Sequence, residues 1–174
     1  RIPLGPFHSW LRKLLMSNIR HFTATGFVVD SNAILLHWHP KVLAWLPPGG
    51  HIESNEDPAQ TVLREVFEET GLKVEILNTR ERLDFDDPIQ IEPPFIIMLE
   101  KISDKIIGNH KHIDMIYFCK LVEKKYSLKP DWLWVLKEDL LTDLPLMTPD
   151  GSFKTIPEDV KSLAIKAFEY AEKK

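Results

Sequence analysis

The chain has 174 residues, of which 44% are hydrophobic and 28% charged, and its formal net charge is −4. This length predicts one domain with a substantial core, and the acidic balance argues against a surface that coats nucleic acid, which needs a basic stripe. No apolar run reaches the roughly 18 residues that span a membrane, and no signal-peptide pattern is present. The single cysteine, Cys119, excludes an internal disulfide and favours a reducing, cytoplasmic location.

Residues 1–20 predict an extension ahead of the main domain. Residues 7–16 have the spacing of a short amphipathic helix, with apolar side chains on one side and Arg12 and Lys13 on the other. Such a basic helix can lie on a membrane or join two subunits, although packing on its own domain is commoner. We therefore expect an N-terminal extension over 1–20, a single domain over 21–174, and a homodimer as an open alternative.

Three strands are expected before the first long helix. Residues 21–30 and 33–38 read as strands joined by a tight turn at Ser31 and Asn32, and residues 43–46 form a short third strand. The Pro-Pro-Gly-Gly run at 47–50 stops this third strand. Its prolines and glycines predict an abrupt turn that brings backbone carbonyls close to the following helix.

The remaining elements alternate strands with two further helices. We expect strands over 73–77, 95–102, 113–122 and 132–136, a polar hairpin region between the first two, and a hydrophilic, mobile loop over 103–112. A short helix is expected over 137–141 and a closing amphipathic helix over 157–173. This order predicts an α/β fold, an α/β/α sandwich around a mixed sheet.

The helix after the glycine turn has a signal at each end. Asp57 is a good N-cap, Pro58 suits the first helical position, Gln60 completes a capping box, and Gly71 is the expected left-handed stop. One side of this helix is predicted to be apolar and another acidic. The apolar side gathers Ala59, Val62, Leu63, Val66 and Phe67, and the acidic side gathers Glu65, Glu68 and Glu69.

The neighbouring negative charges on the acidic side destabilise this helix unless a positive charge compensates them. Like charges at this spacing destabilise a helix by roughly 0.2–0.5 kcal/mol per pair. Arg64 is expected to offset only Glu68, its i+4 neighbour. Clustered carboxylate oxygens suit a hard divalent cation such as Mg²⁺ or Mn²⁺, whereas three glutamates alone are more often a solvated helix face.

The spacing of residues 50–72 distinguishes these readings. The stretch reads Gly50, then Glu56 after five residues, then seven residues, then Arg-Glu-Val-Phe-Glu-Glu-Thr-Gly-Leu from 64 to 72. This stretch resembles the complete Nudix box, with no departure at a fixed position. Seven fixed residues would match by chance about once in 10⁸ start sites, which makes the resemblance specific within this segment.

The resemblance implies the α/β/α sandwich and a metal-dependent hydrolase that cuts a nucleoside diphosphate linked to another group, X. It implies Mg²⁺ or Mn²⁺ held by Glu68 and Glu69, with Glu65 as a ligand or base and with Gly49, or alternatively Gly50, offering a carbonyl. Arg64 is expected to orient a carboxylate, with Glu56 as its partner. The implied catalytic set is Glu56, Arg64, Glu65, Glu68 and Glu69.

Several residues outside the box keep alternatives open. A general base could lie outside it, and no spacing selects among Glu92, Glu100, Asp104, Asp114 and Glu138. His110 and His112 with Asp114 form a pattern that can read as a metal triad, although such pairs are usually surface or strand residues, and a contact to substrate is the better functional reading. Glu53 is a weaker loop candidate. Aromatic residues could stack a base but are more often core, namely Trp45, Phe85, Trp132 and Trp134.

The box leaves X undefined, so no substrate-binding residue is assigned. Pro88 lies sixteen residues past the box, as in the ADP-ribose group of the family, and a (d)NTP or a nucleotide sugar fits nearly as well. A catalytically silent ligand sensor is the main alternative, although such modules commonly lose acids of the box. An isopentenyl-diphosphate isomerase needs an active-site cysteine, and Cys119 in a strand-like run fits that role poorly.

Overall fold

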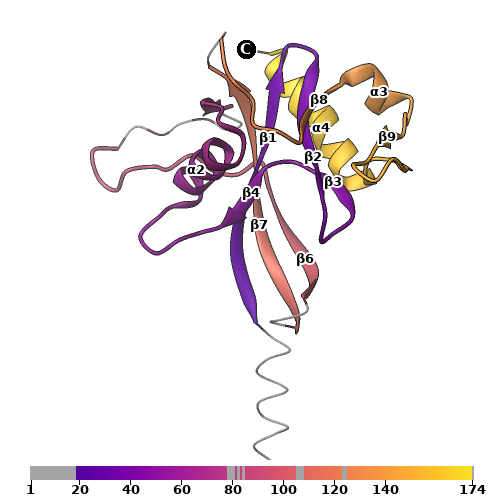
Figure 1. Ribbon diagram of the computed structural model, residues 1–174. Coiled ribbons are helices and arrows are strands. Elements are labelled where there is room, and N and C mark those ends of the chain that lie inside the picture. Colours follow the sequence, from indigo (N-terminus) through magenta and orange to yellow (C-terminus); the bar gives the residue numbers. More distant parts are fainter. Residues whose placement is uncertain are drawn as a thin grey trace, which may run out of the picture.

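The computed structural model describes residues 19–77, 81, 83, 85–104, 108–122 and 125–173 (Figure 1). The amphipathic helix predicted over 7–16 lies outside the described residues, as does part of the hairpin region expected before residue 87. None of the described helices is both long and apolar enough to cross a membrane.

A mixed sheet of eight strands is built around the pairing of two long strands. Residues 20–29 of β1 (Arg20–Asp30) pair in parallel with residues 111–120 of β7 (Gly108–Leu121). All other pairings are antiparallel. They join β1 to β2 (Ala33–His39) and β4 (Gly49–His51), β2 to β3 (Ala44–Leu46) and β8 (Trp132–Leu136), and β7 to β5 (Val74–Ile76) and β6 (Ile96–Asp104).

One helix covers each face of this sheet. Figure 1 shows α2 (Pro58–Thr70) on one side and α4 (Glu158–Ala171) on the other. Alternate residues of β1 supply both cores, because successive strand side chains point to opposite faces. Ala24 and Val28 pack with α2, while Phe27 and Val29 pack with α4. The predicted α/β/α sandwich around a mixed sheet is confirmed.

The rest of the chain adds short elements. The helix predicted over 137–141 is present as α3 (Lys137–Leu141), and the closing helix begins after Pro157 as expected. Two strands that the sequence did not reveal, β9 (Leu146–Met147) and β10 (Phe153–Lys154), form a separate two-stranded sheet. A strand of two residues is too short to show an alternation of apolar and polar side chains, so the sequence pattern cannot predict it.

The prediction of a mobile loop over 103–112 is wrong. Strand β6 continues to Asp104 and β7 begins at Gly108, with Ser103 opposite Asn109 and Ile102 opposite His110. Backbone hydrogen bonds hold this part of the hairpin, so exposed polar side chains conceal it from a pattern based on hydrophobicity. Consequently His110 and His112 are strand residues on one face of the sheet rather than loop residues.

The apolar side of α2 is narrower than predicted. Ala59, Val62 and Val66 are buried, but Leu63 is 38% exposed and Phe67 is 50% exposed. These last two residues are four apart and lie one position, about 100° around the helix, from the buried valines. The helix contacts the sheet along a single stripe, which leaves Leu63 and Phe67 outside the contact.

Gly26 of β1 lets α2 approach the sheet closely. A Cβ atom at this position would lie 2.9 Å from Cγ2 of both Val62 and Val66. These β-branched side chains are stiff, so an added methyl group would push the helix away rather than find new space. The glycine therefore fixes the height of α2, and of its glutamates, above the sheet.

We predict that Gly26→Ala lowers the free energy of unfolding by about 1–3 kcal/mol, the usual cost of overpacking a core. Urea unfolding followed by circular dichroism measures this change. Adding Val66→Ala should make room for the new methyl group, so the double variant should be more stable than the sum of the two single losses. Strictly additive losses would show that the close contact is not the cause.

Candidate active site

The acidic helix α2 begins and ends where the sequence predicted. The Asp57 carboxylate accepts a hydrogen bond from the Gln60 backbone N–H at 2.8 Å, and the Asp57 N–H donates to the Gln60 side chain at 3.0 Å. Gly71 has a φ of 79°, and its N–H donates to the Phe67 carbonyl at 2.9 Å. These caps fix the rotation of the helix and therefore the directions of its glutamates.

The C-terminal carbonyl groups of α2 are satisfied by a distant segment. Lys129 Nζ donates to the Glu68 carbonyl at 2.5 Å, and Trp132 Nε1 donates to the Glu69 carbonyl at 3.1 Å. A cation at this end also opposes the helix dipole. Sequence reasoning missed both contacts, because no local spacing connects residues 129–132 to α2.

Arg64 is the centre of the polar network around α2. Its Nε and Nη2 donate to the two oxygens of Glu56 at 2.7 and 2.9 Å, which confirms the predicted pair. Nη1 donates to Glu65 at 2.8 Å and to Glu68 at 3.1 Å, and Nη2 also donates to the His51 carbonyl at 3.1 Å. The expectation that Arg64 offsets only Glu68 is wrong, because the planar guanidinium binds several acceptors at once.

Glu56 is committed to this network. Its hydrogen bonds with Arg64, and secondarily with Thr61, lower the pKa of its carboxyl to about 2. Thr61 Oγ1 donates to the same carboxylate at 2.9 Å. With both oxygens occupied by protein donors, Glu56 is suited to holding Arg64 rather than to binding an ion itself.

The two glycines before the helix form a cradle for the acids. The predicted stop after Leu46 and the bend at Pro48 are present, but residues 49–51 form strand β4 rather than part of the turn, and they pair with β1. The Gly49 N–H donates to the Glu69 carboxylate at 3.2 Å. A Cβ atom at Gly50 would overlap the Glu65 carboxylate. Both glutamates therefore lie directly against glycine backbone, which brings this stretch within reach of the acidic cluster.

Negative charge is in excess at this cradle. Burial, together with the charges of Glu65 and Glu68, raises the pKa of Glu69 from 4.5 to about 7, although the Gly49 N–H opposes the shift. Four carboxylates meet one arginine and one lysine, Lys129. Hard oxygen ligands with unbalanced charge fit a hard divalent cation, so Glu65, Glu68 and Glu69 could hold one.

A cavity of about 610 Å³ extends from this cradle across the face of the sheet that α4 covers. Gly49, Gly50 and Glu69 lie at one part of its wall. Of the five acids considered as bases outside the box, Glu100, Asp104 and Asp114 line the cavity. Glu92 and Glu138 are not among its lining residues.

Asp114 and Glu100 have different environments in this cavity. Asp114 is buried and accepts hydrogen bonds from the hydroxyl groups of Thr23 and Thr25, each at 2.8 Å. Burial still raises the pKa of Asp114. Burial, with the charges of Asp114 and Asp159, raises the pKa of Glu100 to about 7. Glu100 can therefore exchange a proton near neutral pH.

None of the four aromatic residues considered for base stacking is among the residues that line this cavity, but Trp132 packs behind one that does. It stacks on His37, which lines the cavity, with ring centroids 4.3 Å apart. Trp45 is buried in the core under α4, and Trp134 packs on the core under α2. Phe85 is 58% exposed and is not among the lining residues. Cys119 is buried, as predicted.

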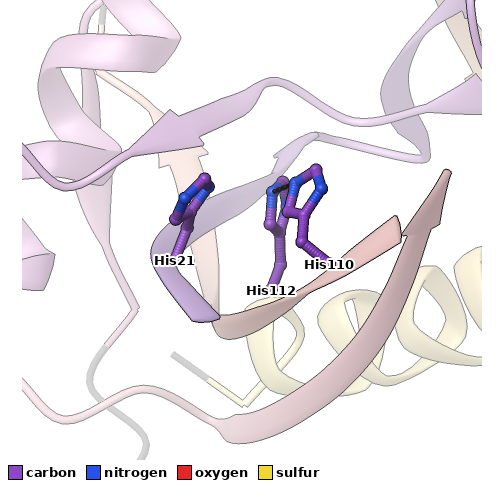
Figure 2. A group of neighbouring side chains, drawn as sticks. All are labelled: His21, His110 and His112. Atoms are coloured by element: carbon purple, nitrogen blue, oxygen red, sulfur yellow. Dashed lines mark hydrogen bonds between the residues drawn. The ribbon is translucent and has the colours of Figure 1, made fainter. Parts of the chain in front are cut away.

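His110 and His112 meet other histidines rather than Asp114. Figure 2 shows them on one strand, with His21 of the neighbouring strand beside them. His51 is also close, with its Nε2 3.2 Å from Nδ1 of His21. Burial, with the charges of the other three histidines, lowers the pKa of His112 to about 4. Sequence reasoning missed His21, because only the parallel register of β1 and β7 places it there.

Comparison with protein families matches a NUDIX domain to residues 19–157. The chain belongs to the NUDIX family. Among curated relatives, it is 30% identical over 118 residues to a probable DHNTP pyrophosphohydrolase of Lactococcus lactis subsp. cremoris. That alignment covers 67% of this chain and 64% of the relative's own length.

Solved structures of other proteins share the fold described here. A NUDIX-family hydrolase from Clostridium perfringens is 29% identical, with a TM-score of 0.69 over 88% of this chain and 99% of that one. An Ap4A hydrolase from C. elegans is 17% identical, with a TM-score of 0.54 over 88% of this chain and 99% of that one. The second similarity concerns the fold alone.

The raised pKa of Glu69 predicts a stability change with pH. Between pH 4.5 and about 7, folded Glu69 keeps a proton that the unfolded chain releases, so the free energy of unfolding falls as the pH rises. Glu69→Gln keeps an oxygen for the Gly49 N–H and removes this cost. In chelator at about pH 8 the variant should be more stable by about 1–2 kcal/mol, with no difference at about pH 4.

Urea unfolding across this pH range measures the effect. Glu75→Gln is the control, because Glu75 is exposed and pairs only with Lys120 among the contacts described for it. Curves for Glu69→Gln that run parallel to those of the parent would contradict the raised pKa.

Proposed function

We propose that this protein is an Mg²⁺- or Mn²⁺-dependent hydrolase that cuts the pyrophosphate linkage of a nucleoside diphosphate derivative by attack of water at phosphorus. One observation supports this most strongly. Glu65 and Glu69 lie against the Gly49–Gly50 backbone at the wall of a cavity large enough for a nucleotide, and Arg64 binds both Glu65 and Glu68 beside them. The complete box and the NUDIX relatives agree with the same reaction class.

The acidic cradle would hold the cation. Glu68 and Glu69 are the principal ligands, with Glu65 as a further ligand and the Gly49 carbonyl as a backbone ligand. When bound, the ion neutralises phosphate charge and lowers the pKa of the attacking water. Arg64 holds Glu65 and Glu68 in orientation, and Glu56 holds Arg64.

Glu100 is the base that the environment of the cavity favours. A general base works best with a pKa near the operating pH, and Glu100 has a pKa of about 7. Asp114 has both oxygens bound by threonine hydroxyls, so it is less free to take a proton. Glu100 lines the same cavity as Glu69, which supports a role for Glu100 as acceptor of the proton of the attacking water.

The substrate is a small anhydride of phosphate with a nucleotide or a related ring. His37 and His39 line the cavity, and the Trp132 ring behind His37 stiffens this wall, where a base could stack. DHNTP joins ADP-ribose, (d)NTPs and nucleotide sugars as candidates, because the Lactococcus relative is named for it. The buried, reduced thiol of Cys119 suits action in the cytoplasm.

The two alternative functions have less support. An isomerase would need a reactive cysteine in the cavity, but Cys119 is buried beneath α2, and burial raises the pKa of its thiol to about 12. A silent sensor needs no intact acidic cluster, whereas every acid of the box is present, with Glu65 and Glu69 against Gly49 and Gly50 and with Glu56 and Glu68 bound to Arg64.

We predict that Glu68→Gln or Glu69→Gln lowers kcat by roughly 100-fold or more, because charge stabilisation at phosphorus is lost. Turnover of ADP-ribose, dNTPs, UDP-sugars and DHNTP in the presence of Mg²⁺ is followed by separating the products by chromatography. Cleavage of the pyrophosphate linkage gives two phosphomonoesters, or a monophosphate with pyrophosphate, and no free phosphate. EDTA should abolish turnover, and Mg²⁺ or Mn²⁺ should restore it. Glu75→Gln serves as the control, and full turnover in EDTA would refute the assignment.

The acid limb of the pH–rate profile should depend on Glu100. With its pKa near 7, Glu100 must lose a proton to act as a base, so kcat/KM should rise as the pH rises through about 7. Glu100→Gln should lower kcat by roughly 10²–10⁴-fold and remove this limb. An unchanged profile in the variant would assign the base elsewhere.

A further inference from the structure

Three histidines gather on one face of the sheet, outside the acidic cradle. His21 of β1 lies directly opposite His112 of β7 in the parallel register, and His110 precedes His112 by two residues on the same face. In Figure 2 the three rings stand on the same side of these strands. Each offers a ring nitrogen, and these three atoms lie within 4.8 Å of one another.

The distances suit a tetrahedral transition-metal ion. Zn²⁺ binds imidazole nitrogen at about 2.0–2.1 Å, so two such ligands in a tetrahedron lie about 3.3–3.4 Å apart. Nε2 of His110 and Nε2 of His112 are 3.2 Å apart. The remaining spread of up to 4.8 Å is a distance that small side-chain rotations can close.

A second contact prepares His110 for this role. Its Nδ1 lies 2.9 Å from the Gly108 carbonyl, which can only accept, so Nδ1 carries the proton and Nε2 carries a free lone pair. Histidine ligands of metals are commonly fixed in this way by a carbonyl behind the ring. The proton between the two Nε2 atoms then belongs to His112, and moving it to Nδ1 of that ring frees both atoms for a metal.

One acid lies beside the cluster. Glu100 of β6 is directly opposite His112 in the antiparallel register, and both residues line the large cavity. A metal ion binds the neutral form of imidazole. His110 is only 6% exposed, so its ring is held in place, while His51 and His112 line the large cavity and keep the cluster open to an entering ion.

We propose that His21, His110 and His112 form a binding site for a divalent transition-metal ion, Zn²⁺ first among them, separate from the carboxylate site of α2. Mg²⁺ prefers oxygen ligands and would not compete for three imidazoles, whereas Zn²⁺, Co²⁺ and Ni²⁺ accept them. His51 lies beside the site, with its Nε2 3.2 Å from Nδ1 of His21. The fourth ligand of the ion would be either a water molecule or the His51 ring. This inference is independent of the proposed activity.

The test uses the full chain with any histidine tag removed. After treatment with EDTA and dialysis, Zn²⁺ is titrated by calorimetry in excess Mg²⁺, and Co²⁺ is added separately to record its visible absorption. The parent should bind one Zn²⁺ at this site and give the intense absorption of tetrahedral Co²⁺. His110→Gln/His112→Gln should weaken Zn²⁺ binding by more than about 100-fold, beyond the 10–100-fold expected for losing an outer contact.

Two variants separate this site from others on the chain. Glu68→Gln removes a carboxylate of α2 and should leave the Zn²⁺ affinity and the Co²⁺ spectrum unchanged. His39→Gln, which changes a histidine of β2 that belongs to a different strand pair, should also change neither. His21→Gln alone replaces the double variant if that variant fails to fold.

The outcomes that overturn the proposal are clear. Equal Zn²⁺ affinity in the parent and in the folded histidine variants would show that the imidazoles do not bind the ion. Loss of Zn²⁺ binding in Glu68→Gln with retention in the histidine variants would place the ion on α2. An absence of saturable Zn²⁺ binding in the parent would also reject the site.

Discussion

The hydrogen bonds of Arg64 are the interaction on which this architecture depends. Three glutamates on one turn-and-a-half of helix repel one another, and Glu69 is also partly desolvated. The guanidinium binds Glu56, Glu65 and Glu68 and reaches the carbonyl of His51 on β4. It thus joins the helix, the preceding loop and the sheet edge around one positive charge. The carboxylates can remain close together because this charge lies between them.

One face of the sheet supports the acidic helix, the other face lines the cavity, and Gly49 and Gly50 lie where the two meet. The face under α2 seats the acidic helix, and Gly26 sets how closely it sits. The face toward α4 lines the cavity with Asp114 and Glu100. Gly49 and Gly50 join these two sides, because a strand without Cβ atoms lets the carboxylates of α2 contact the backbone at the rim of the cavity.

Features that depend on residues close together in the sequence could be predicted. Features that depend on the pairing of strands far apart in the sequence could not. The caps of α2 and the Arg64–Glu56 pair follow from residues within one segment. The place of His21 beside His112 depends on a parallel register between strands some ninety residues apart, which no local pattern encodes. The exposure of Phe67 depends on how α2 is seated. The polar residues of the β6–β7 hairpin hid its strands for a related reason, since ladder hydrogen bonds do not require apolar side chains.

The hydrogen bonds from Lys129 and Trp132 to the last carbonyl groups of α2 have a consequence for the nascent chain on the ribosome. The acidic helix leaves the exit tunnel well before the residues that bind its last carbonyl groups, and β1 emerges long before its parallel partner β7. Strand pairing of this kind must wait for the later segment. The glutamates therefore reach their final arrangement only after most of the polypeptide has been translated. A shorter nascent chain would contain the residues of the Nudix box without the arrangement that forms the site.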